Sequence, residues 1–191
     1  MAREIDAHEH ALIAIIKPLH TAKWQADYRW DRVKKSLEQL GVDYGGIELN
    51  PDFQRGHVWT AEQQVLFVEN CLRGVVASNG FLLQFNCASW SDNSLASDLP
   101  PGIQCVDGLQ RYTAINRFVD GEIKPFGCHV DEFKGTQFHP SKMHMKVAIH
   151  DFTSRADLLF HYLSINTGGT VHSAEEIARV RVLLAQAKQG G

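Results

Sequence analysis

The chain has 191 residues, of which 44% are hydrophobic and 21% charged, and its formal net charge is −3. These values are ordinary for a globular protein with a buried core. They exclude a protein coated in positive charge for non-specific DNA binding. A local basic cleft stays compatible with them, so nucleic acid as a partner has to be argued from a site.

The N-terminus and the cysteines indicate the compartment. Residues 1–6 lack the charged-then-apolar order of a signal peptide, and no apolar run reaches membrane-spanning length. The cysteines form no Cys-x-x-Cys pair and have apolar neighbours, which predicts reduced, buried thiols; they are Cys71, Cys87, Cys105 and Cys128. We therefore expect a cytoplasmic protein without membrane contact.

The first fifty residues predict one long helix and one short strand. A short apolar run at residues 11–16 is stopped by Pro18. Apolar residues three and four apart predict an amphipathic helix from about Trp24 to Leu40, closed by Gly41. Alternation at residues 47–49 predicts a strand.

The next segment carries the clearest helix start in the chain. Thr60 is followed by Gln63 at the capping-box spacing, and the apolar face of that helix runs to Gly74. Residues 81–85 have the pattern of a buried strand. The polar, turn-rich residues 87–102 predict one long loop.

The second half of the chain alternates strands and helices. We expect strands at residues 103–106 and 145–149, a helix at 109–119 and irregular structure with short strand-like pieces at 122–143. Two further helices are expected at about residues 155–164 and 174–188. The second is introduced by a capping box of Ser173 and Glu176. No internal repeat or low-complexity linker divides the chain.

The most informative local pattern is the strand-to-helix turn at residues 107–111. A carboxylate, Asp107, ends the strand, Gly108 allows close approach to the backbone, and the N–H groups of a helix start point outward. Arg111 could bind a phosphate, Asp107 could hold Mg²⁺, and Gln110 could orient a water. Alternatively, Asp107 caps the helix and Arg111 pairs with a surface carboxylate.

Two other segments could contribute to a site. Gln54 and Arg55 lie in a loop just before the helix that Thr60 begins, and Trp59 there either packs on the core or stacks on a base. Asn166 precedes a glycine pair and a helix start, where it either ends one helix or contacts a ligand.

Taken together, three motifs resemble the domain family known for an Asp-Gly-Gln-Gln-Arg motif. That family forms the N-terminal half of type IV, modification-dependent restriction enzymes of the GmrSD kind and of related phage-defence proteins, within the ParB/sulfiredoxin-like superfamily. The resemblance covers about residues 45–185. Its motifs are Gln54-Arg55 with Val58-Trp59, Asp107 to Arg111 with Thr113-Ala114, and Asn166-x-Gly-Gly with Ser173-Ala-Glu-Glu-Ile.

The resemblance implies a mixed α/β fold with a small ParB/sulfiredoxin-like sheet flanked by helices and a helical C-terminal segment. We expect residues 1–44 to form an N-terminal helical segment ahead of a nucleotide-binding domain at 45–191, with the two forming one compact unit overall.

It also implies a nucleotide site, and the carboxylate of Asp107 beside phosphates favours Mg²⁺ as its metal. The residues that match the family's binding positions are Gln54, Arg55, Gly108, Gln110, Arg111 and Asn166. Asp107 matches the leading aspartate and is the expected metal ligand. With Arg55, Gln110 and Arg111 it would form the catalytic set for hydrolysis of a nucleoside triphosphate.

Three departures from the family pattern bear on this expectation. Leu109 replaces the first glutamine of the motif, and leucine can serve neither as a metal ligand nor as a nucleophile. Residues 75–81 lack the Pro-rich turn common after the first helix. The chain ends at Gly191 without room for a C-terminal nuclease, and its histidines form no His-Asn-His nuclease pattern.

Three functions follow from these patterns. The first is Mg²⁺-dependent NTP hydrolysis or phosphoryl transfer linked to DNA restriction, modification or phage–host conflict, with DNA, a nuclease or a host protein as further partners. The second is a non-catalytic module that senses a nucleotide or inhibits a host system. The third is a DNA nuclease or base-modifying enzyme with a cleft lined by Arg55, Arg111 and Lys134.

Overall fold

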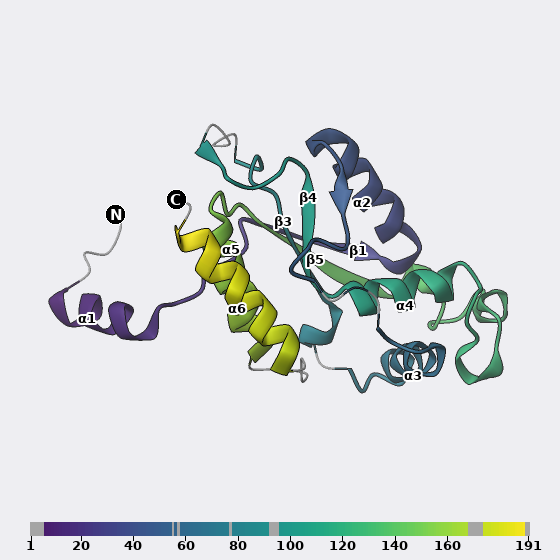
Figure 1. Ribbon diagram of the computed structural model, residues 1–191. Helices are drawn as coiled ribbons and strands as arrows, with labels where there is room; N and C mark the ends of the chain where they lie inside the picture. Colours follow the sequence, from purple (N-terminus) through teal and green to yellow (C-terminus); the bar gives the residue numbers. More distant parts are fainter. Residues whose placement is uncertain are drawn as a thin grey trace.

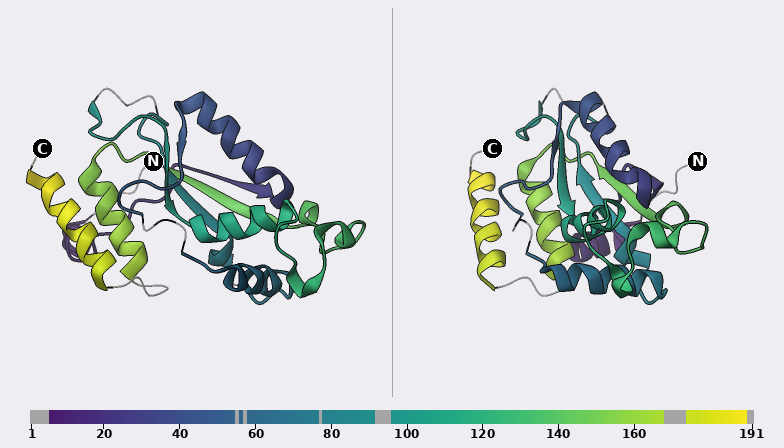
Figure 2. Two further views of the ribbon diagram at one scale, coloured as in Figure 1. Left: turned by 45° about the vertical axis from the view of Figure 1, so that its right-hand side comes forward. Right: turned by 90° about the vertical axis from the view of Figure 1, so that its right-hand side faces the viewer.

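A five-stranded mixed sheet forms the centre of the computed structural model, with helices on both faces (Figures 1 and 2). The structure describes residues 6–54, 56, 58–76, 78–91, 96–167 and 174–189. The strands are β1 (Trp24–Arg29), β2 (Ile47–Glu48), β3 (Leu82–Asn86), β4 (Ile103–Asp107) and β5 (His144–His150). The helices are α1 (Ala7–Ile16), α2 (Trp30–Tyr44), α3 (Ala61–Leu72), α4 (Leu109–Val119), α5 (Arg155–Thr167) and α6 (Ala174–Gln189). The predicted mixed α/β class is confirmed.

The strand order is β1-β5-β3-β4-β2. β5 pairs antiparallel with β1 and parallel with β3, while β4 pairs antiparallel with β3 and parallel with β2. A register shift between Gln84 and Phe85 places Asp107, the last residue of β4, opposite Gln84. The strand end that carries the predicted site therefore lies inside the sheet, beside the start of β3.

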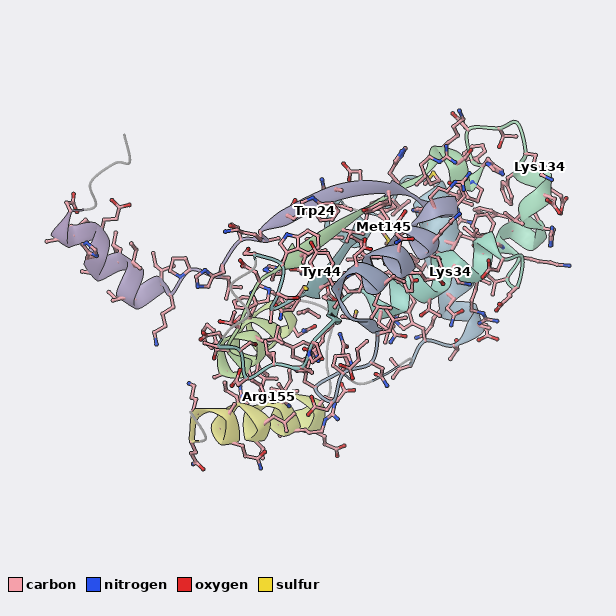
Figure 3. The ribbon with its side chains drawn as sticks, turned by 90° about the horizontal axis from the view of Figure 1, so that it is seen from above. Trp24, Lys34, Tyr44, Lys134, Met145 and Arg155 are labelled. Atoms are coloured by element: carbon pink, nitrogen blue, oxygen red, sulfur yellow. The ribbon has the colours of Figure 1, made fainter. Side chains whose placement is uncertain are left out.

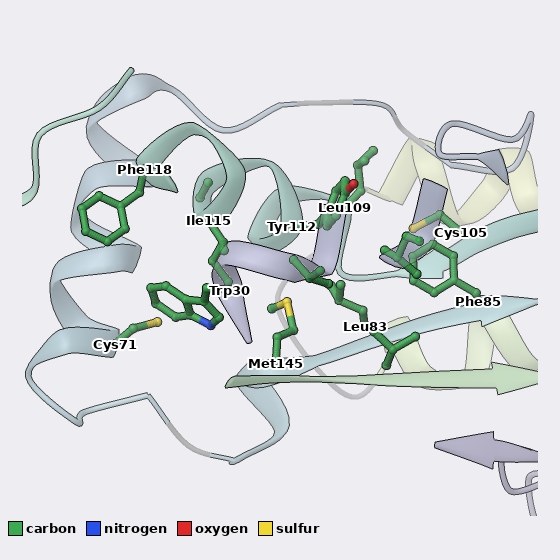
Figure 4. Close-up of a cluster of buried hydrophobic side chains, with 14 of the residues drawn as sticks. Trp30, Cys71, Leu83, Phe85, Cys105, Leu109, Tyr112, Ile115, Phe118 and Met145 are labelled. Atoms are coloured by element: carbon green, nitrogen blue, oxygen red, sulfur yellow. The ribbon is translucent and has the colours of Figure 1, made fainter. Parts of the chain in front are cut away.

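The larger hydrophobic core lies between the sheet and α2, α3 and α4. Its members include Trp30 from α2, Cys71 from α3 and Phe118 from α4, packed against strand residues such as Leu83 and Met145 (Figure 4). Because strand side chains alternate between faces, Leu83 and Phe85 both point into this core. Burying this apolar surface is the main source of the stability of the fold.

A smaller core lies on the opposite face, under α5 and α6. Val106 of β4 packs there with Leu158, Leu159 and Tyr162 of α5 and with Val180 of α6. Figure 2 shows α5 next to the sheet and α6 outside it. The two helices at the end of the chain therefore reach the sheet on the side away from α2.

The helix predicted from Trp24 to Leu40 is wrong at both ends. Residues 24–29 form β1, in which Trp24, Ala26 and Tyr28 alternate inward and the backbone pairs with β5. The helix begins at Trp30, where the three-and-four spacing of apolar residues starts. It continues past the buried Gly41 and ends at Gly45, whose φ of 92° is left-handed.

Several other predictions are confirmed. Thr60 and Gln63 form both halves of a capping box at the start of α3, and α4 spans the predicted residues 109–119. The strand-like pieces expected within residues 122–143 are wrong, because that segment consists of three short 3-10 turns and connecting loops. The Ser173 half of the last predicted capping box lies outside the described residues.

Helix α1 lies apart from the rest of the molecule (Figures 1 and 3). None of its residues is buried, and it exposes Leu12, Ile13, Ile15 and Ile16. Its side-chain cap is Asp6, which accepts a hydrogen bond from the Glu9 N–H at 2.8 Å. The body of the fold therefore begins at the segment that leads from α1 to β1.

Candidate functional site

The β4–α4 turn depends on Gly108. This residue has φ 99° and ψ 5°, a left-handed conformation that favours glycine, and no side chain caps α4. A Cβ there would lie 2.5 Å from Leu83 Cδ2 and 3.1 Å from the Leu82 carbonyl oxygen. Gly108 is therefore required both by its backbone conformation and by close packing on β3, and the start of α4 carries no capping side chain.

Asp107 and Arg111 form an ion pair across this turn. Arg111 Nη2 donates to Asp107 Oδ2 at 2.5 Å, and the two side chains are 20% and 34% exposed, respectively. Arg111 Nε is buried and has no hydrogen-bond partner among the described residues. The carboxylate that pairs with Arg111 is therefore Asp107, in the same turn. A positive and a negative group stand together at the helix start.

Gln110 bridges α4 to the loop before α3. Its amide donates to the Gly56 carbonyl at 2.7 Å and accepts from the N–H groups of Val58 and Trp59 at 3.0 Å each. Both ends of the amide are therefore used to hold residues 56–59. Trp59 lies against Phe67, with ring centroids 5.3 Å apart, and packs on the larger core.

Gln54 attaches the same loop to β4. Its side-chain amide donates to the carbonyl oxygens of Val106 at 2.9 Å and Cys105 at 3.2 Å. The loop that precedes α3 is therefore bound to the strand by Gln54 and to the helix by Gln110. Arg55, the residue between these attachments that the sequence placed in the site, lies outside the described residues.

Two arginines that the sequence analysis did not single out hold the beginning of this loop. Arg179 of α6 donates to the carbonyl oxygens of Asp52 at 3.0 Å and Gln54 at 2.9 Å. Arg155, at the start of α5, pairs with the Asp52 carboxylate at 2.6 Å. Their separation from Asp52 along the chain exceeds 100 residues, so no local spacing could have revealed them.

Asn166 lies in the last turn of α5. Its Nδ2 donates to the Tyr162 carbonyl of the same helix at 2.8 Å. This contact agrees with the helix-ending alternative considered for it. The structure does not bring Asn166 into a described hydrogen bond with the β4–α4 turn.

Leu109, the departure from the family motif, is a core residue. It is 8% exposed and packs in the larger core beside Tyr112 and Ile115 (Figure 4). Its side chain thus points away from the outer surface of the turn, and its leucine identity is explained by burial.

The neighbouring thiol is unreactive for a similar reason. Burial, together with the nearby Asp107 carboxylate, raises the pKa of Cys105 to about 12. Cys105, Cys71 and Cys87 are buried and free, as predicted, while Cys128 is partly buried. A thiolate nucleophile is therefore not available at this turn near neutral pH.

Lys134, expected to line a DNA cleft with Arg111, is positioned elsewhere. It lies in the exposed turn region after α4 and pairs with Asp131 at 3.0 Å. Figure 3 shows Lys134 at the opposite end of the molecule from Arg155, which binds the loop next to the turn. Among the described residues no hydrogen bond or ion pair joins Lys134 to Arg111, and Arg55 lies outside them.

Comparison with known proteins gives one match. The family model described as GmrSD restriction endonuclease, N-terminal domain, matches residues 37–168, more than half of the chain. Neither a curated protein nor a solved structure gives a significant match. In the part of the chain that the structure describes, every helix is too short or too polar to cross a membrane.

Proposed function

Because the chain belongs to the family of GmrSD restriction endonuclease N-terminal domains, we propose that it acts in phage–host restriction as a nucleotide-binding protein. The β4–α4 turn is the proposed site for the phosphates of a nucleoside triphosphate. DNA, a nuclease or a host protein would be the further partner through which the bound nucleotide acts.

The observation that carries this proposal is the position of Arg111 and Asp107 at an uncapped helix start. The first N–H groups of α4 lie on the positive end of the helix dipole, and Gly108 has no side chain to shield them. Arg111 uses one of its five N–H donors on Asp107, so donors remain for phosphate oxygens. These features fit an anion better than a neutral ligand.

The ion pair also fits a site for Mg²⁺. A Mg²⁺ ion commonly takes one or two protein carboxylates and completes its shell with phosphate oxygens and water, and it supplies neutralisation of phosphate charge. Asp107 offers one such carboxylate, one-third exposed. On nucleotide binding, Arg111 would exchange Asp107 for a phosphate oxygen, and Asp107 would be released to hold the metal.

Hydrolysis is the stronger form of this proposal, with Arg111 and Arg55 stabilising charge on the transferred phosphoryl group and Asp107 holding the metal. A second candidate is a non-catalytic nucleotide sensor. It is favoured by Gln110, since both ends of its amide are engaged with residues 56–59. It is also favoured by the burial of Leu109, which leaves no side chain at that position for chemistry.

Calorimetric titration with ATP, GTP, CTP and UTP, with and without Mg²⁺, tests the site, and phosphate release tests the chemistry. Arg111→Gln should weaken nucleotide binding about 10- to 100-fold, since a hydrogen bond to a charged group contributes about 1.5–3 kcal/mol. Asp107→Asn should make binding insensitive to Mg²⁺. Arg181→Gln, on the exposed surface of α6, is the control that leaves binding unchanged.

The outcomes separate the candidates. Mg²⁺-dependent phosphate release that Arg111→Gln abolishes supports hydrolysis. Saturable binding without turnover supports the sensor. If none of the four nucleotides gives heat or thermal stabilisation, the site is not a nucleotide site and both candidates fail.

A further inference from the structure

Two buried histidines outside the β4–α4 turn have ring nitrogens without partners. His150 ends β5 and His161 lies in α5; each is 3% exposed, and their ring centroids are 4.5 Å apart. His150 Nδ1 and both ring nitrogens of His161 lack a hydrogen-bond partner among the described residues. A buried polar atom left unpaired costs about 1–3 kcal/mol. Three of them in one place indicate a site that a ligand completes.

A cavity adjoins these rings. Two neighbouring hollows of about 180 and 170 Å³ share the residues His20, Phe152 and Asp157, and one reaches His150 while the other reaches His161. We call them together the histidine pocket. Its lining includes His20, His150, Asp151, Phe152, Asp157 and His161, and also the hydrogen-bond donors Lys17, Thr21 and Thr153. Each hollow is smaller than the roughly 300 Å³ at which sites for drug-sized ligands begin. The occupant is therefore about the size of one heterocyclic ring system.

An exposed strap covers the pocket. Residues 17–21, which lead from α1 to β1, are exposed throughout, and His20 meets the Phe152 ring edge-on at 5.8 Å. Lys17 at the start of the strap has φ 48°, in the left-handed region that disfavours lysine. Among the described residues no hydrogen bond is found from residues 18–21 to the body of the fold, so this segment can shift without breaking one and admit a ligand to the buried histidine nitrogens.

The buried ring nitrogens and the carboxylates of the pocket are mostly acceptors. His150 Nε2 lies 3.1 Å from Gln84 Oε1. With that oxygen accepting, Nε2 carries the proton and Nδ1 is a bare acceptor. A neutral His161 offers one donor and one acceptor, whereas Asp151 and Asp157 offer carboxylate acceptors only. A ligand that reaches these atoms must offer them more donors than acceptors, while Lys17, Thr21 and Thr153 can donate to it.

The charge of the pocket side chains further restricts the class of ligand that can bind. Burial holds the pKa of His150 at about 4, with His161 and His20 adding to the effect, although Asp151 opposes it. Burial also lowers the pKa of His161. Both rings are thus neutral near pH 7 and lie beside two carboxylates, so they offer no positive charge to a phosphate; Lys17 is a cationic side chain of the lining. No group of three metal-binding side chains in the described residues is arranged to hold a metal ion.

We propose that the histidine pocket binds a nucleobase that carries an amino group, as cytosine, adenine and guanine do. The planar base would lie against the aromatic wall, in which His150 and Phe152 stack at an interplanar angle of 17°. Its amino and ring N–H groups bind the acceptor nitrogens and Asp157. This site is separate from the phosphate site at Arg111 and does not depend on it.

Titration with matched nucleosides tests whether the pocket prefers a base with an amino group. Cytidine and uridine have nearly the same shape, but cytidine has an amino donor where uridine has a carbonyl acceptor. Calorimetry or an NMR titration should give saturable binding of cytidine, adenosine or guanosine, and at least about 10-fold weaker binding of uridine. Equal binding of uridine, or no nucleoside binding up to about 10 mM, well above the millimolar affinity expected of so small a ligand, would overturn the proposal.

Variants locate the binding. His161→Leu should weaken cytidine binding about 10-fold or more while leaving thermal stability equal or higher, because it removes two unpartnered nitrogens. Asp157→Asn at the exposed rim should weaken it about 5- to 10-fold without unfolding risk. His144→Leu, exposed at the other end of β5, is the control. Unchanged affinity in Asp157→Asn and in any folded His161→Leu overturns the proposal.

Two further arms complete the test. Nucleosides carry no phosphate, so Arg111→Gln should leave cytidine binding unchanged; a parallel loss would assign the nucleoside to the β4–α4 turn and overturn the second site. Competition between cytidine and a cytosine-containing single-stranded or duplex oligonucleotide fixes the source of the base. Displacement upholds the site with a base from nucleic acid, and its absence upholds the site for a free nucleoside.

Discussion

The two faces of the sheet differ in the polarity of their buried side chains and in how many of the buried polar atoms have a hydrogen-bond partner. The face under α2 and α4 buries apolar side chains such as Leu83 and Phe85. The face toward α5 carries buried polar residues, among them Asn86, Gln104 and His150. Asn86 is satisfied, since it bonds both the N–H and the carbonyl of Phe152 at 2.8 and 3.1 Å.

Unpartnered atoms concentrate on the polar face. Of the six buried side-chain atoms without a partner in the described residues, four lie there: Gln104 Oε1, His150 Nδ1 and both ring nitrogens of His161. The apolar face therefore stabilises the fold and fixes the β4–α4 turn, whereas the polar face contains buried donors and acceptors that could bind a ligand. Four experiments test this difference between the two faces.

The largest effect is expected in the apolar core. Phe118 is fully buried and meets Trp30 and Phe133 edge-on. Phe118→Ala should lower the free energy of unfolding by about 3–5 kcal/mol, through lost burial and the cavity left behind. Urea denaturation measures it, with the exposed Phe138→Ala as the matched control. A loss below about 1 kcal/mol would contradict the assigned core.

Acid should weaken the polar face through His150. Its pKa is about 4 in the folded protein, against 6.5 for an ordinary histidine. Above pH 6.5 both states are neutral there. As pH falls from 6.5 to 4, the unfolded chain takes up a proton that the folded protein resists, so the free energy of unfolding should fall by up to about 3 kcal/mol.

Carboxylates titrate in the same range, so the comparison is with His150→Leu. Denaturation midpoints measured from pH 7 to pH 4 should fall less steeply in this variant than in the wild type. His144→Leu should follow the wild type, since His144 is exposed. Parallel curves for all three proteins would show that His150 titrates normally.

A smaller loss is expected from Gly108→Ala. Alanine would take up the unfavourable positive φ, at about 1–2 kcal/mol, and would press its Cβ on Leu83 and the Leu82 carbonyl. Gly74→Ala has a similar φ of 74° but no atom within 4 Å of the added Cβ. The excess loss in Gly108→Ala over Gly74→Ala, measured by denaturation, therefore reports the packing of the turn on β3. Equal losses would refute it.

The smallest effect on stability is expected from Gln110→Leu. It removes the three hydrogen bonds that hold residues 56–59, and about 1–2 kcal/mol should be lost, because water can reach part of this loop. Faster amide hydrogen exchange at Val58 and Trp59 is the direct readout. Gln39→Leu, exposed on α2, should leave both measurements unchanged.

Much of the fold could be predicted wherever the controlling interactions are local. The Thr60–Gln63 capping box involves residues three apart, and the bounds of α4 follow from its apolar spacing and the glycine before it. The strand at residues 24–29 could not be predicted in this way. Its conformation is set by pairing with β5, more than 100 residues away.

In the candidate site, too, the local contacts could be predicted from the sequence and the long-range contacts could not. The Asp107–Arg111 pair spans one helical turn, so its spacing alone allowed the contact. The attachments of Gln110 to residues 56–59 and of Arg179 to residues 52–54 join distant segments. Their partners are backbone groups, which leave no signal in residue identity.

Motif order and short-range spacing are properties of the chain, so the family, the mixed α/β class and the strand–Gly108–helix turn could be predicted from the residues. Long-range packing placed Leu109 in the core, joined Gln110 to a loop and brought His150 and His161 together under α5. Burial and the pairing of buried polar atoms depend on which segments fold together. These contacts form only when the sheet assembles and brings the segments together.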